Sequence, residues 1–143
     1  MRKIRLDIKL GLIFLSMMVV SSTISIATEG DFGPELEIST IKGGIARISI
    51  EIQNNGDSVA ENVTSTISVK GGFLNRIDIF DECSGCSHCN NTISPGENKI
   101  ESTNQLIFGL GAIDIVATAN ATGTPTIEKT ASGFVIGPLI ILN

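Results

Sequence analysis

The sequence contains no Trp and no Tyr, and its 143 residues include one His, three Cys and six Phe. A catalytic triad or a three-His zinc site needs imidazoles that His88 alone does not supply. A platform for stacking sugars or bases needs aromatic rings, which are equally scarce. These absences exclude several classes of active site, and we expect a protein that is not an enzyme.

Positive charge is scarce as well. The chain has 10 Lys and Arg against 15 Asp and Glu, a net charge of −5. Beyond residue 27, six cations remain against 14 acids, and these cations are scattered singly. Because nucleic-acid binding depends on clustered Lys and Arg, the sequence excludes a nucleic-acid partner.

Residues 1–27 have the pattern of an export signal. A basic head made of Arg2, Lys3, Arg5 and Lys9 precedes seventeen uncharged residues, 10–26. Small residues at Ser25 and Ala27 suit cleavage after Ala27, which makes the segment a signal peptide. An uncleaved membrane anchor is the other interpretation, since about 17 apolar residues can just span a bilayer. In both cases we expect the remainder to be extracytoplasmic, secreted or held at the outer face of the cytoplasmic membrane, with membrane contact only through an uncleaved leader.

After a linker over residues 28–34, the chain alternates apolar and polar residues, which is typical of antiparallel β-sheet. The clearest run sets Ala46, Ile48, Ile50 and Ile52 against Arg47, Ser49, Glu51 and Gln53. The turn-forming residues 54–57 separate it from a second run over 62–69, so the two runs predict a hairpin. Further strands are expected over residues 36–42, 73–80, 100–108, 112–120 and 126–143.

No stretch beyond the leader has a sustained helical period, so we expect essentially no helix. Seven short strands at about ten-residue spacing predict an all-β, two-sheet antiparallel sandwich of immunoglobulin type over residues 35–143. The core is expected to contain Ile48, Ile50, Ile52, Ile67, Val69, Ile113 and Ile115. The outward residues are expected to include Arg47, Glu51, Thr66 and Asp114.

Two segments carry a resemblance to a known family. Residues 50–63 read IEIQNNGDSVAENV, and residues 93–97 read ISPGE. They resemble CARDB-type modules, the cell-adhesion-related β-sandwiches of exported archaeal and bacterial proteins, over about residues 36–108. In that family an Asn-x-Gly turn ends one strand, and a Pro-Gly-Glu turn precedes a later one. The end of the chain departs from the pattern, since it closes on an apolar run instead of an acidic, Asn-rich strand. The resemblance implies a non-catalytic exported module.

The segment 83–89 contains the residues that could form a disulfide or bind a metal. Cys83, Cys86 and Cys89 have C-x2-C-x2-C spacing, and His88 lies between the last two. An oxidised loop would form one disulfide among three pairings and leave one thiol, which could link two copies into a disulfide-bonded homodimer. A zinc site would use these thiolates and His88. An iron–sulfur cluster lacks its fourth Cys, because Ile93 stands at that position. A reduced, inert loop is the remaining interpretation, and no cofactor is otherwise expected.

Three Asn-x-Thr sequons, at Asn62, Asn90 and Asn120, are candidate glycosylation sites on wet faces or loops. The acidic residues Asp78, Asp81 and Glu82 lack the ligand spacing of a calcium loop and are expected to form a solvated rim.

The run 134–142 is the most apolar stretch beyond the leader. We favour a buried final strand, kinked at Pro138 on an edge, over an exposed apolar edge that contacts another module or a membrane. The expected function is a structural or adhesion-like interaction module whose partners are other cell-surface proteins. The second hypothesis is a metal-binding or thiol-redox module that uses the 83–89 loop.

Overall fold

The computed structural model describes residues 33–83 and 91–143, all within a compact unit that spans Asp31–Asn143. The predicted leader, residues 1–27, and most of the Cys-containing loop lie outside the described residues. The elements are β1 (Leu36–Gly43), β2 (Ile48–Asn54), β3 (Thr64–Gly71), a 3-10 turn η1 (Phe73–Asn75), β4 (Ile77–Cys83), β5 (Asn98–Ser102), β6 (Gly109–Asn120), β7 (Ile127–Gly137) and β8 (Leu139–Leu142). No helix of the described residues is long and apolar enough to cross a membrane.

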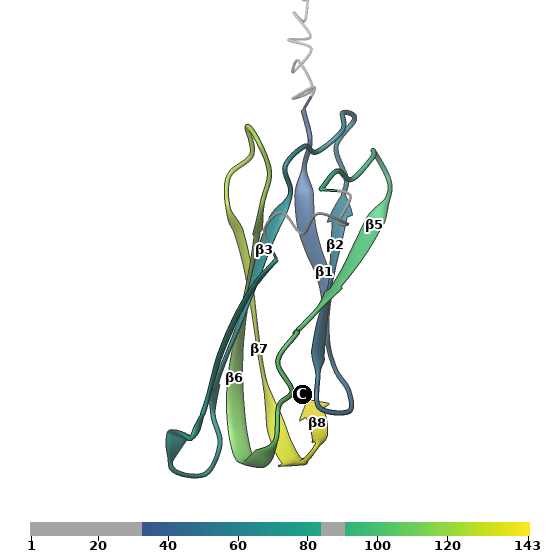
Figure 1. Cartoon of the computed structure of the whole chain (residues 1–143). Coiled ribbons are helices and arrows are strands. Elements are labelled where there is room, and N and C mark those ends of the chain that lie inside the picture. Colours follow the sequence, from purple (N-terminus) through teal and green to yellow (C-terminus); the bar gives the residue numbers. More distant parts are fainter. Residues whose placement is uncertain (1–32, 84–90) are drawn as a thin grey trace, which may run out of the picture. The chain divides into compact units, whose positions relative to one another are not determined.

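The strands form two antiparallel sheets packed face to face, which confirms the predicted immunoglobulin-type sandwich (Figure 1). One sheet has the order β1-β2-β5, and the other has the order β4-β3-β6-β7-β8. The described segments hold eight strands instead of the seven expected. The extra strand arises because the last apolar run folds back at Gly137 and Pro138 into β7 and β8.

The core follows the alternation of the sequence. All seven residues predicted to face inward are buried, and Ile48, Ile52 and Ile115 have no exposed surface. Asp114 and Arg47 are exposed, while Glu51 and Thr66 lie half-buried on the outer faces. The period of two along each strand therefore sets the two faces of each sheet as predicted.

The predicted hairpin between residues 46–53 and 62–69 is wrong, because β2 and β3 lie in different sheets. Both edges of β2 are taken, by β1 and by β5. The connection crosses between the sheets, and it is held by paired backbone hydrogen bonds between Ala60 and Ile93, each 3.0 Å. The residues after β2 thus serve as a crossover and not as a hairpin turn.

Two other strand boundaries differ from those expected. The run 73–80 begins as η1, because Leu74 and Asn75 have left-handed backbone angles, φ 58° and 52°. The run 100–108 ends as a strand at Ser102. Beyond it the chain crosses to the other sheet, where the Asp81 carboxylate accepts hydrogen bonds from the backbone N–H groups of Asn104 and Gln105 at 3.0 and 3.1 Å.

Candidate interaction surface

The Cys-containing loop falls mostly outside the described residues, which leave out Cys86, His88 and Cys89. Cys83 is the last residue of β4, where its backbone lies opposite Ser65 of β3. Cys83 therefore belongs to a strand end, whereas the sequence analysis placed the whole segment 83–89 in a loop. Within residues 33–83 and 91–143, no three His, Cys, Asp or Glu side chains gather as a metal site. The disulfide and metal interpretations stay predictions.

Two of the predicted glycosylation sequons, 62–64 and 120–122, lie opposite each other where β3 begins and β6 ends. The Asn62 side-chain amide donates to the Thr122 hydroxyl at 2.9 Å, and the Thr64 hydroxyl donates to the Asn120 carbonyl oxygen. Each sequon thus supplies a partner to the other. Such cross-strand polar pairs stabilise a sheet, which gives these Asn-x-Thr patterns a structural role. Asn90 lies outside the described residues, and glycosylation stays a prediction.

The outer face of β6, β7 and β8 carries an exposed apolar surface near one end of the domain. The register aligns Leu110, Ile136 and Leu139 in one cross-strand row. Ala112, Phe134 and Ile141 form the next row. The five large side chains of these rows are between 43% and 56% exposed. The predicted burial of the run 134–142 is therefore correct only for alternate residues such as Val135 and Ile140.

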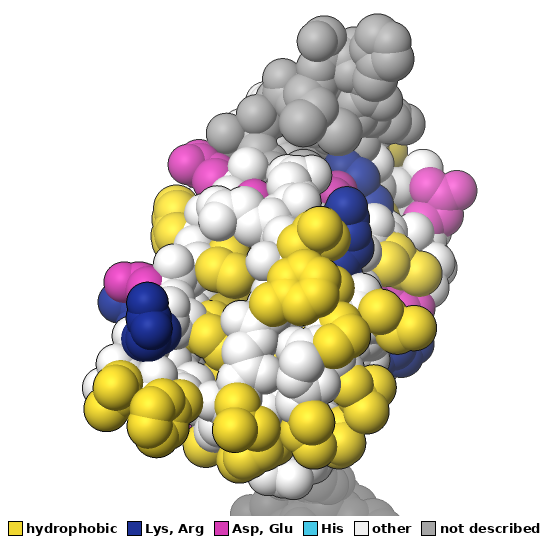
Figure 2. Space-filling model, turned by 60° about the horizontal axis from the view of Figure 1, so that its bottom comes forward, with side chains coloured by type: hydrophobic (Ala, Val, Ile, Leu, Met, Phe, Trp, Pro, Cys, Tyr) yellow, Lys and Arg dark blue, Asp and Glu magenta, His cyan; other side chains and the backbone are white. Residues whose placement is uncertain are grey.

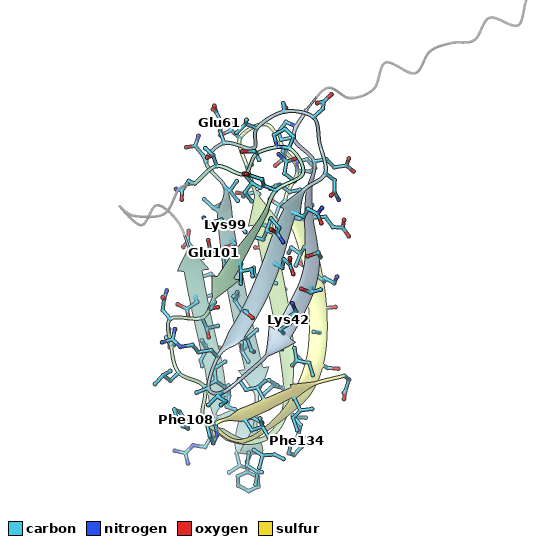
Figure 3. The ribbon with its side chains drawn as sticks, turned by 90° about the vertical axis from the view of Figure 1, so that its right-hand side faces the viewer. Lys42, Glu61, Lys99, Glu101, Phe108 and Phe134 are labelled. Atoms are coloured by element: carbon cyan, nitrogen blue, oxygen red, sulfur yellow. The ribbon has the colours of Figure 1, made fainter. Side chains whose placement is uncertain are left out.

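Loops at the same end extend this surface. Ile45, in the connection between β1 and β2, is 78% exposed, and Phe73 and Leu74 of η1 are 68% and 77% exposed. Phe108, just before β6, is exposed as well. Figure 2 shows hydrophobic side chains gathered over this end with few charged groups among them, and Figure 3 shows Phe108 and Phe134 there. We call these loops and the two rows the apolar end.

Close backbone approaches at glycine hold the apolar end together. Gly71, with φ 131°, lies so near the Ala112 carbonyl that a Cβ would collide with it. A Cβ on Gly133 would collide with the carbonyl oxygen of Ile141. The glycine-rich segments of the sequence therefore allow neighbouring strands to present large side chains outward while their backbones stay in contact.

Charge is distributed unevenly along the domain. A row across the outer face brings Lys70 of β3 opposite Asp78 of β4 and Asp114 of β6, with a Lys70–Asp78 pair at 4.0 Å. Two loop segments of the apolar end, 44–47 and 72–76, contain Arg47 and Arg76 as their charged residues. These two loops thus carry two cations and no acid, although the sequence as a whole is acidic.

A polar cluster covers the outer face of the three-stranded sheet. The Glu51 carboxylate accepts hydrogen bonds from the Asn98 amide and, at 3.1 Å, the Thr40 hydroxyl, and it pairs with Lys42 at 3.7 Å. The bond from Asn98, with smaller contributions from Thr40 and Lys42, lowers the pKa of Glu51 below its ordinary value of 4.5. This arrangement links β1, β2 and β5 at the surface through the hydrogen bonds and the ion pair of the Glu51 carboxylate.

The sequence did not reveal the inward-facing charges of β5. Lys99 and Glu101 form an ion pair at 2.8 Å and lie opposite the buried Ile52 and Ile50 of β2. Ile100 between them points outward and is exposed. The alternation of apolar and polar residues alone would place Ile100 inside and Lys99 and Glu101 outside. Because β5 is the last strand of its sheet, inward charges protect that edge from pairing with another chain.

The asparagine that ends β2 is a second residue whose role the sequence did not reveal. The Asn54 side-chain amide donates to the carbonyl oxygens of Ser58 and Ile93 at 2.8 and 2.9 Å. Its own carbonyl oxygen accepts from the backbone N–H groups of Glu35 and Gly56, both at 3.1 Å. Asn54 is fully buried, so it fixes three segments of the chain at the end opposite the apolar one.

Comparison with known proteins yields little about function. No protein-family model matches the chain, and no curated protein matches it. Among solved structures, a crystal structure described as the ApaA protein from Bordetella pertussis is similar at 14% sequence identity and a TM-score of 0.45. The match covers 73% of this chain and 95% of that chain. A likeness of this size carries no argument about activity, so the function has to be inferred from the surface of the domain itself.

Proposed function

We propose that this chain is a non-catalytic, extracytoplasmic interaction module of CARDB type that contacts the cell surface through its apolar end. The observation that carries the proposal is the exposure of nine large apolar side chains at one end, Ile45, Phe73, Leu74, Phe108, Leu110, Phe134, Ile136, Leu139 and Ile141. Soluble monomers rarely leave a patch larger than a few hundred Å² uncovered, and larger patches mark contact sites.

The CARDB assignment has local support. The Asn-x-Gly segment follows β2, where Asn54 fixes the crossover, and Pro95-Gly96-Glu97 directly precedes β5. In this turn the Gly96 N–H donates to the backbone carbonyl oxygen of Asn54 at 2.8 Å. The two motif segments therefore act together at one end of the sandwich, which is a physical reason for them to occur in the same sequence.

Retention on the host cell surface tests the proposal. The exported protein would be compared with a Phe73→Ser/Leu74→Ser variant and with a matched control, Ile100→Ser, which removes an exposed apolar side chain from another surface. We expect the first variant to be released from cells and the control to be retained. Equal retention of all three proteins in the form that has lost its leader would refute an interaction role for the apolar end.

The metal or redox alternative would be recognised by a separate measurement. Elemental analysis and thiol titration of the exported protein report on Cys83, Cys86 and Cys89 directly. One disulfide and no metal are expected for the interaction module. A stoichiometric metal ion bound through these residues would instead favour the second hypothesis.

A further inference from the structure

The most exposed apolar side chains of the apolar end stand on loops. Ile45, Phe73 and Leu74 are each more than two-thirds exposed, whereas the rows on β6, β7 and β8 are about half exposed. Single protruding apolar side chains are suited to insertion into the interfacial region of a lipid bilayer. A protein partner is usually bound through a flatter and larger patch.

Leu74 adopts a conformation that costs stability. Its φ of 58° lies in the left-handed region, which a residue with a large side chain rarely occupies. Its side chain is 77% exposed, so packing within the domain offsets little of the conformational free energy that this backbone geometry costs. Strain of this kind at an exposed apolar residue points to a functional reason for its position.

The charges of the apolar end select the kind of surface that it meets. Arg47 lies two residues after Ile45 and is exposed, with one guanidinium N–H donated to the Thr103 carbonyl at 2.9 Å, and Arg76 follows η1 directly. Arginine binds phosphate groups well because its planar guanidinium presents several donors. A second copy of the chain docking through the same end would bring like charges together, which disfavours self-association. A surface of anionic phosphate groups complements both arginines.

We infer that the apolar end docks on a membrane surface that contains anionic lipid. Ile45, Phe73 and Leu74 enter the boundary between headgroups and acyl chains, and Arg47 and Arg76 contact the phosphates. This inference rests on the proposed function and names the partner of the same surface. It places lipid contact in the domain itself, in addition to any contact through an uncleaved leader.

Because the chain contains no Trp and no Tyr, a single introduced Trp gives a fluorescence signal from one known position. A Leu74→Trp substitution in the full chain introduces a single indole at the apolar end. Vesicles of equimolar phosphatidylcholine and phosphatidylglycerol should shift its emission to the blue, and brominated acyl chains should quench it. The control, Ile100→Trp, places the indole on the outward face of β5 and should respond to neither. The indole reports on its own surroundings, so the comparison holds with or without the leader.

Two further variants separate charge and strain from folding. Adding Arg76→Gln to Leu74→Trp should weaken binding to the anionic vesicles by roughly fivefold, as expected for one cation near such a surface. Leu74→Asn should unfold at the same temperature as wild type or higher, because Asn tolerates the left-handed conformation, and yet bind vesicles less tightly than wild type.

Several results would overturn the inference. The first is an emission of Leu74→Trp that does not change when vesicles are added. The second is a response of Ile100→Trp to vesicles equal to that of Leu74→Trp. The third is a blue shift that appears when the protein alone is concentrated, which would identify a second copy of the chain as the partner. If Phe73→Ser/Leu74→Ser also releases the protein from cells while the vesicles have no effect, the partner is a protein. That combination refutes lipid binding and leaves the proposed function in place.

Discussion

Replacing Asn54 probes how the two sheets are joined. Asn54→Ala removes four hydrogen bonds at once, two donated by the amide to Ser58 and Ile93 and two accepted from Glu35 and Gly56. These bonds use the full capacity of an asparagine side chain. Asn54 also closes the 94–97 turn through its backbone, and that contribution survives the substitution.

The magnitude follows from what each partner loses. A net contribution of about 0.5–1.5 kcal/mol for each bond gives a range of about 2–6 kcal/mol. Part of this is recovered, because the Ile93 carbonyl keeps the Ala60 N–H at 3.0 Å and the exposed Glu35 N–H can reach water. We therefore expect a loss of about 3 kcal/mol, which corresponds to a fall in melting temperature of roughly 12 °C for a domain of this size.

A second substitution at the same position tests the donors alone. Asn54→Asp keeps the size and both accepted bonds, but it turns a carboxylate oxygen toward the carbonyls of Ser58 and Ile93. Burial and the facing carbonyls raise the pKa of such a carboxyl. This variant should therefore lose more stability than Asn54→Ala at neutral pH and regain part of it as the pH falls, when the carboxyl protonates and can donate.

Urea unfolding followed by circular dichroism measures both variants. The matched control is Asn55→Ala, the neighbouring residue, whose amide donates to the Glu37 carboxylate at an exposed site at 2.7 Å. It should change stability by less than about 0.5 kcal/mol. Equal losses for Asn54→Ala and Asn55→Ala, at unchanged slope of the unfolding curve, would refute the argument that Asn54 joins the sheets.

Three other predictions concern the core, a surface carboxylate and the Cys loop. Ile50→Ala should cost about 2–5 kcal/mol and clearly more than Glu51→Ala in urea melts, because Ile50 is buried between the sheets. Since the pKa of Glu51 is lowered in the folded chain, its contribution is present above pH 4.5 and is lost as the pH falls through the folded pKa. The stability of Glu51→Gln should thus fall less on acidification, and parallel curves for both proteins would contradict this. The triple variant Cys83→Ser/Cys86→Ser/Cys89→Ser should keep a cooperative thermal transition within several degrees of wild type, since any disulfide here closes a loop short enough to contribute below roughly 3 kcal/mol. An unfolded variant would show that the loop stabilises the domain.

The sequence alone determined the class of fold and the seven core residues that alternation assigned. Alternation assigned Ile48, Ile50 and Ile52 to one face of a strand, and burial followed because a side-chain period of two leaves little choice of register. Turn residues marked where strands end. These are local properties, and a local pattern is sufficient to specify them.

Strand partners were decided by tertiary structure. The segment 54–57 has the composition of a hairpin turn, and it nevertheless begins a crossover, because Asn54 finds its partners at Glu35 and Ile93, far away in the chain. Likewise, the inward Lys99–Glu101 pair depends on β5 lying at the edge of its sheet. A local pattern holds no information about which strand lies alongside.

The apolar end marks the same limit for function. In the run 134–142 both faces of the strands are apolar, so alternation gives no signal and the expectation of burial was the natural one. Only the turn at Gly137 and the pairing of β7 with β6 and β8 put Phe134, Ile136 and Leu139 on an outer face. Hydrophobicity is a property of the residue, whereas its exposure depends on what the rest of the chain places over it.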